Sequence, residues 1–177
     1  MHGIIHKSLK EYVEDRMSDG AWDALLDEAG IEPKLYLPVS HYPDEEVTAI
    51  VTTIADNAGR SERAVQRDFG EFLAPELLDT FKAHVKDDWD TLDVLARLEA
   101  IYEGIEQSSD DTSPPAVETA RDGDTVTVVY RSDRELCAMA EGIVHGVAAD
   151  RGESVSVDQP VCVHEGDDHC ELVVTRA

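Results

Sequence analysis

The stretch "VVYRSDREL", residues 128–136, changes character halfway along its length. Its first three residues are apolar or aromatic, as in a strand, and the serine and aspartate that follow are residue types that begin helices. Tyr130, Ser132 and Arg134 alternate across this junction. A phenol, a hydroxyl and a guanidinium in one corner would suit a ligand that carries carboxylates, because all three donate hydrogen bonds. A helix N-cap beside a surface ion pair would use the same residue types.

The segments around this stretch have the periodicity of helices before it and mostly of strands after it. We expect helices over residues 4–17, 21–30, 42–59 and 61–81, the last bent or broken near Gly70 and Pro75, and one long amphipathic helix over residues 87–107. A polar loop over residues 108–118, a strand over 125–130, a helix over 132–152 and two strands around Gly166 and Asp167 complete the chain. This order predicts an α+β fold, with a helical N-terminal subdomain up to about residue 60 and a C-terminal subdomain with a small antiparallel sheet over about 61–177.

The composition is strongly acidic, with 39 Asp and Glu against 15 Lys and Arg and a net charge of -24. This charge excludes nucleic acid and anionic membranes as partners. Acidity spread along a chain with little lysine is typical of a protein from a halophile, although an ordinary acidic protein can share it. No apolar run is long enough to span a bilayer, and the N-terminus lacks the apolar core of a signal peptide. Three cysteines fit a reducing compartment, so we expect a cytoplasmic protein.

Five sequence landmarks occur together and in a fixed order. They are Met1-His2-Gly3 before a helix, "FGEFL" at 69–73, Pro114-Pro115, the Tyr130/Ser132/Arg134 triplet and "CVHEGDDHC" at 162–170. With them the chain resembles the haem nitric-oxide/oxygen-binding (H-NOX) family over nearly all of its length, and in particular the bacterial subgroup with a cysteine-rich zinc site. The resemblance implies one domain whose C-terminal part cradles a haem, with the triplet on the haem propionates. It also implies a sensor of a diatomic gas or of redox state that acts on a separate signalling protein, such as a histidine kinase or regulator.

The chain departs from the family at the iron ligand. The family's proximal histidine lies on the long helix before the proline loop, and the position that matches it here is Tyr102. A phenolate ligand favours ferric iron, so Tyr102 is expected either to ligate a ferric haem or to be a core tyrosine that ligates nothing. Neither His84 nor His145 is placed by the sequence where it would replace the missing ligand. Met139 stands where relatives can carry a distal tyrosine, and because a thioether donates no hydrogen bond, stable oxygen binding is not expected.

Three cysteines, Cys137, Cys162 and Cys170, are candidates for a zinc site that some bacterial relatives hold with three cysteines and one histidine. The histidine of those relatives corresponds to Gln159 here, so a fourth ligand has to come from His164 or from water. Hairpin alternation would put His164 on the cysteine face. The alternative is three thiols that pack as small apolar groups, with an occasional Cys162–Cys170 disulfide.

Two classes of function therefore remain open from the sequence. The first is a haem-based sensor, and the second is a haem-free module of the same fold that binds another small molecule or a protein. An enzyme is not expected, because no nucleophile–base pairing or phosphate-binding loop is present. A Soret absorption band in the purified protein would separate the first class from the second.

Overall fold

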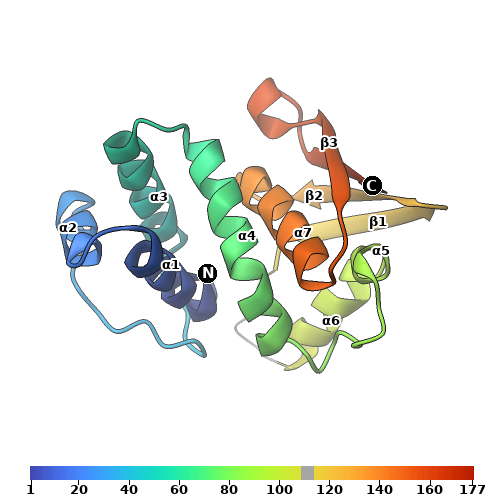
Figure 1. The fold of residues 1–177 in the computed structure, drawn as a ribbon, viewed down its shortest axis with the longest axis horizontal. Coiled ribbons are helices and arrows are strands. Elements are labelled where there is room, and N and C mark those ends of the chain that lie inside the picture. The colour runs from blue at the N-terminus through green and yellow to red at the C-terminus, as the bar shows by residue number, and fades with distance from the viewer. Residues whose placement is uncertain (109–113) are drawn as a thin grey trace.

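The structure is a computed structural model that describes residues 1–108 and 114–177 (Figure 1). Its N-terminal half consists of the helices α1 (Gly3–Arg16), α2 (Ala21–Glu28), α3 (Asp44–Ala58) and α4 (Glu62–Thr80). The C-terminal half contains α5 (Thr91–Leu95), α6 (Leu98–Ser108), β1 (Ala116–Asp122), β2 (Thr125–Arg131), α7 (Cys137–Asp150), β3 (Val155–Val161), a 3₁₀ turn (Val163–Glu165) and β4 (Cys170–Arg176). The predicted α+β class is confirmed. Among the described residues, no helix has the length and apolarity needed to cross a membrane.

The four strands form one antiparallel sheet in the order β1-β2-β4-β3. Alternate residues of β2 are buried, and Val126 and Val128 pack with Leu172 and Val174 of β4 against residues of α5 and α7. The strand β1 was not predicted from the sequence, because it is an exposed edge strand with little apolar alternation. Its one local signal is the Asp-Gly pair at 122–123, which begins the turn into β2.

The helix α4 is continuous, so the expected bend or break near Gly70 and Pro75 does not occur. The close packing of α4 on α7 explains both residues. A side chain at Gly70 would lie 2.2 Å from the carbonyl oxygen of Met139 in α7, so glycine permits the contact instead of ending the helix. Pro75 cannot bond the carbonyl of Glu71, and Gly146 of α7 approaches that same carbonyl. In Figure 1, α7 lies between α4 and the sheet.

The predicted long helix over residues 87–107 is in fact two helices, α5 and α6, with a break at residues 96–97. Two side chains, one from the sheet and one from the junction itself, donate hydrogen bonds to carbonyl groups near this break. The hydroxyl of Thr119 in β1 donates a hydrogen bond to the carbonyl of Ala96 at 3.2 Å, and Nη1 of Arg97 donates to the carbonyl of Asp93 at 2.9 Å. The break depends on the sheet, which is why helical periodicity alone did not reveal it.

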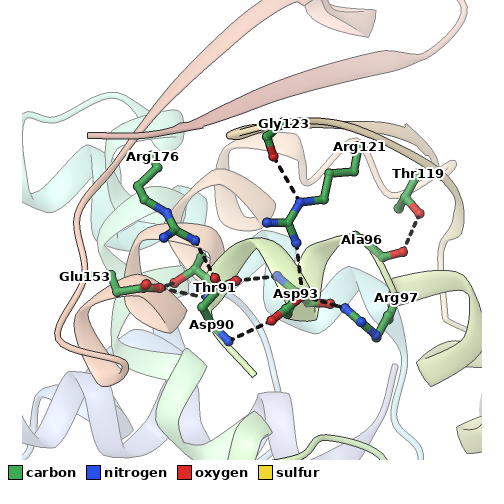
Figure 2. A network of polar contacts seen from close by, with 10 residues as sticks. All are labelled: Asp90, Thr91, Asp93, Ala96, Arg97, Thr119, Arg121, Gly123, Glu153 and Arg176. Carbon is green, nitrogen blue, oxygen red and sulfur yellow. Dashed lines mark hydrogen bonds and ion pairs between the residues drawn. The ribbon is translucent and has the colours of Figure 1, made fainter. Parts of the chain in front are cut away.

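A polar network holds α5 in place against the end of the sheet (Figure 2). The carboxylate of Glu153, just beyond α7, accepts hydrogen bonds from the backbone nitrogen and the hydroxyl of Thr91 at 2.8 and 2.6 Å. Ion pairs join Arg176 to Asp90, and both Arg97 and Arg121 to Asp93. The network therefore fixes the start of the α5–α6 segment, which carries Tyr102.

The helix after β2 begins at Cys137 and not at Ser132, which corrects the expected helix over 132–152. Glu135 has a left-handed backbone with φ of 53°, and the Ser132 hydroxyl accepts a hydrogen bond from the backbone nitrogen of Arg134 at 3.3 Å. These residues form a turn. Tyr130, Ser132 and Arg134 thus lie at the end of a strand and in a turn, and no helix N-terminus starts at Ser132.

The buried core has one large cluster among α1 to α4 and further clusters in the C-terminal half. The first cluster also includes Leu136 and Met139, and Ala74 of α4 belongs to a cluster with residues of α5, α6 and α7. Because α4 contributes to both halves, it joins them. The expected boundary near residue 60 falls in the short connection before α4 and stays a prediction.

Candidate functional site

A cavity of about 680 Å³ lies where the N-terminal helices meet the C-terminal half. Its walls come from the start of α1, from α4, α5, α6 and α7, and from the end of β2. Most of the lining is aliphatic or aromatic, and the polar side chains in it are those of His2, His41, Tyr102, Tyr130 and Arg134. An apolar cavity of this size with a few convergent polar groups is typical of a cofactor or ligand site.

The structure brings the predicted triplet together at one wall of this cavity. Tyr130 and Arg134 line it, and Ser132 contacts both, through the backbone nitrogen of Arg134 and through the phenol of Tyr130. Burial raises the pKa of the Tyr130 phenol, although the Ser132 hydroxyl and Arg134 oppose that shift. Tyr130 is therefore a neutral hydrogen-bond donor near pH 7, beside a permanent cation.

The guanidinium of Arg134 is also tied to the N-terminal half. Its Nε donates to the carboxylate of Asp44 at the start of α3, and the N-terminal amine of Met1 pairs with the same carboxylate. Partial burial tends to raise the pKa of Asp44, but hydrogen bonds from the amine and from Arg134 outweigh it, so the pKa is lowered. The cavity wall at β2 is thereby connected to α1 and α3.

Tyr102 lies on α6 and lines the cavity, as its predicted role requires. Burial, with a smaller contribution from the nearby Tyr130, raises the pKa of its phenol to about 12. The phenol is therefore protonated near neutral pH unless a metal ion replaces the proton. Pro114, Pro115 and Met139 line the same cavity, while residues 109–113 of the predicted polar loop lie outside the described residues.

Two histidines in the cavity wall were not singled out from the sequence. The ring of His2 stands edge-on to that of His41, with ring centroids 5.3 Å apart, and 5.7 Å from that of Phe81. Burial, followed by the charges of His41 and the N-terminal amine, lowers the pKa of His2, so its imidazole is neutral. By contrast, His84 packs against Gly104 on α6, and neither it nor His145 is part of the cavity lining. The only local signal for His2 is its position directly before the first helix.

The residues of this cavity fit a haem. The apolar walls match the macrocycle, Arg134 and Tyr130 offer donors for carboxylates, and Tyr102 or His2 offers an oxygen or nitrogen donor for iron. Tyr102 as the iron ligand stays a prediction.

The three cysteines form a second, separate site. The sulfur atoms of Cys137, Cys162 and Cys170 all lie within 4.8 Å of one another, and those of Cys137 and Cys162 are 3.8 Å apart. All three residues are buried. They come from the start of α7, the residue after β3 and the start of β4, and Cys170 pairs with Tyr130 in the sheet register. The group could hold a metal ion.

The side chain expected as fourth ligand lies elsewhere. His164 is exposed, and its Nε2 is 3.1 Å from the backbone oxygen of Glu135. Strand alternation stops at Cys162 because residues 163–165 form a 3₁₀ turn, which turns His164 away from the sulfur atoms. The side chain of Gln159 contacts Cys137, and Arg63 of α4 lies with Nη1 3.8 Å from the sulfur of Cys162. Arg63 was not expected at this site from the sequence, because Arg63 lies about a hundred residues before Cys162 in the chain.

Comparisons with solved structures find the same fold. An H-NOX protein from S. oneidensis in the Fe(II)NO state has a TM-score of 0.92 and 24% identity, over 100% of this chain and 99% of that chain. The NMR structure of an H-NOX domain from Shewanella oneidensis in the Fe(II)CO state has a TM-score of 0.88 and 23% identity, over 100% and 99%. An unliganded Fe(II) H-NOX protein from K. algicida has a TM-score of 0.83 and 15% identity, over 100% and 97%.

The sequence comparisons point the same way through a family model, although no curated protein sequence matches this chain significantly. The model described as haem-NO-binding matches residues 2–159. This match contains the cavity-lining residues of the helices, the proline pair and the Tyr130/Ser132/Arg134 triplet. On this match over most of its length, the chain belongs to the haem-NO-binding family.

Proposed function

We propose that this chain is a haem-binding sensor domain for a diatomic gas or for redox state, acting on a separate signalling protein such as a histidine kinase or regulator. The observation that carries the proposal is one apolar cavity that joins Tyr102 on α6 to Tyr130 and Arg134 at the end of β2. Membership of the haem-NO-binding family supports it. The haem would supply an iron that binds the diatomic ligand.

The chain's own residues would divide the work of binding. Arg134 and Tyr130 would hold the propionates by a charged and a neutral hydrogen bond, with Ser132 positioning both. Tyr102 would hold ferric iron through its phenol oxygen, because an anionic oxygen ligand favours the ferric state. Met139 in the cavity wall donates no hydrogen bond to a bound gas. The contact of Arg134 with Asp44 gives any shift of the bound group a route to α3 and the N-terminus.

The absorption spectrum of haem-loaded protein, before and after dithionite, tests this proposal. We expect a Soret band and ferric charge-transfer bands that Tyr102→Phe removes, with weaker haem retention. His2→Phe is the matched control, since it also replaces a polar cavity ring by an apolar one. If Tyr102→Phe leaves the spectrum unchanged and His2→Phe alters it, the iron ligand is His2 and Tyr102 is a wall residue.

A second candidate is a haem-free module that binds another apolar carboxylate. Its supporting observation is Tyr102 itself, whose burial keeps the phenol protonated at the position where the family's histidine is expected. Titration with haem would then give no Soret shift, while a fluorescent fatty acid would bind and Arg134→Ala would weaken it. Saturable haem binding with a Soret band would exclude this candidate.

The remaining expectations follow from the same proposal. We expect the sensor to be a cytoplasmic protein without catalytic activity of its own. The predicted zinc ion at Cys137, Cys162 and Cys170 requires a fourth ligand, which is either a water molecule or His164, and His164 reaches that position only if the turn at 163–165 rearranges.

A further inference from the structure

We infer that Cys137, Cys162 and Cys170 form a three-coordinate site for copper(I), a soft monovalent cation, and not a four-coordinate zinc site. The inference rests on the sulfur atoms and on what surrounds them. It is independent of whether the cavity binds haem.

The three thiols are brought to one point by three different elements. Cys137 begins α7, Cys162 follows β3 and Cys170 begins β4, and their sulfur atoms lie within 4.8 Å of one another. The exposed fractions of the three residues are 0%, 3% and 0%, respectively, so the protein fold limits access of water to the sulfur atoms. The backbone nitrogen of Val163 donates a hydrogen bond to the sulfur of Cys170 at 3.4 Å. Such a donor can bond a lone pair that the sulfur of Cys170 keeps when it binds a metal.

The place of a fourth ligand is occupied by hydrogen-bond donors. The amide oxygen of Gln159 faces Arg63, whose Nη2 lies 3.2 Å away, so that oxygen is not directed at the sulfur atoms. The amide nitrogen of Gln159 is buried and makes no hydrogen bond of normal geometry to any described residue. The Gln159 side chain nevertheless contacts Cys137. Neither an amide nitrogen nor a guanidinium has a lone pair to offer a metal. Both can donate to the sulfur lone pairs that a three-coordinate complex retains.

This donor set discriminates between the two metals. Structural zinc is almost always bound by four ligands, and among the described residues no side chain supplies a fourth at this site unless the hairpin rearranges, so zinc would need a water molecule at a buried position. Copper(I) is soft and is selected by thiolates alone. Three thiolates and one copper(I) carry two negative charges, and the Arg63 guanidinium with Nη1 3.8 Å from Cys162 offsets one of them. On binding, three S–H bonds are replaced by three Cu–S bonds and three protons pass to solvent, and no electron moves when the copper is supplied as copper(I).

The test is an anaerobic titration of the whole chain with copper(I) and, separately, with zinc(II), each against a competing chelator. We expect one equivalent of copper(I) to bind, X-ray absorption to show three sulfur neighbours, and zinc to be removed by the chelator. Gln159→His supplies the missing ligand beside Cys137, and it should raise zinc affinity at least about tenfold. Wild-type protein that retains one zinc with a fourth nitrogen or oxygen ligand, or that retains no copper(I), overturns the inference.

Two variants make the assignment residue-specific. Cys170→Ser should no longer bind copper(I). Its circular dichroism and Tm show whether this variant is folded. If it is unfolded, the number of sulfur neighbours in the X-ray absorption of the wild-type protein decides whether copper(I) is bound by three cysteines. His164→Ala is the matched control on the same hairpin, and its copper(I) affinity should equal that of the wild type. Loss of the metal in His164→Ala would show a four-ligand site and would overturn the inference.

Discussion

Arg134 is a single residue with two roles: its guanidinium lines the cavity and also contacts Asp44. Arg134→Ala would leave a bound carboxylate without its charged partner, at a cost of about 2 kcal/mol, so haem affinity should fall at least about tenfold. Competition for haem with apomyoglobin measures this. Arg131→Ala, which removes an equal charge from a half-exposed surface pair with Glu118, is the control and should bind as the wild type does. Equal affinities for both variants would mean that Arg134 only shapes the turn.

Asp44 is a second residue whose ionisation makes the stability of the fold depend on pH. Its pKa is lowered in the folded protein, so its contacts with Arg134 and the N-terminal amine stabilise the fold above the ordinary carboxyl pKa of about 3.9. That stabilisation is lost as the pH falls through the lowered value. The Tm of Asp44→Asn should therefore lie below that of the wild type at pH 7, and the two should converge in acid. A difference that stays constant with pH would exclude the ion pairs as its cause.

At the scale of secondary-structure elements, the position of α5 depends on Glu153. Its carboxylate accepts both polar hydrogens of Thr91, a residue that is 1% exposed (Figure 2). Glu153→Ala would leave these donors unpaired, and we expect about 1–3 kcal/mol less stability to urea. Glu32→Ala, the removal of an exposed carboxylate, is the charge-matched control and should change stability by less than about 0.5 kcal/mol. Similar losses in both variants would assign the effect to net charge.

The net charge of -24 affects the stability of the entire fold. Carboxylates spread over the surface repel one another, and salt screens this repulsion because the Debye length falls from about 10 Å at 0.1 M to about 3 Å at 1 M. We expect the Tm to rise steadily when potassium chloride is increased from about 0.1 M to 3 M, as for a protein from a halophile. Scanning calorimetry over that range tests this. A Tm that is flat or falls would favour the alternative of an ordinary acidic protein.

Local patterns in the sequence were sufficient for the four N-terminal helices and for part of the site. Helical periodicity and capping residues predicted α1 to α4 closely, because those signals act within a few residues of each other. The alternation of Tyr130, Ser132 and Arg134 indicated a carboxylate site, and the resemblance to the H-NOX family added Tyr102; the structure places these residues together at one cavity. The three cysteines were likewise predicted to meet, and they do.

What the tertiary structure alone decided depends on groups that are distant along the chain. Thr119 in β1 takes the carbonyl of Ala96, so a periodic helix is divided into α5 and α6. The N-terminal segment folds back so that His2 lines the cavity, and Arg63 reaches Cys162 across 99 positions. No local pattern encodes such contacts, because each one exists only after helices and strands have packed together. The sequence thus determined which side chains are available for chemistry, and packing determined which of them line the cavity, which lie beside the cysteine sulfur atoms and which face water.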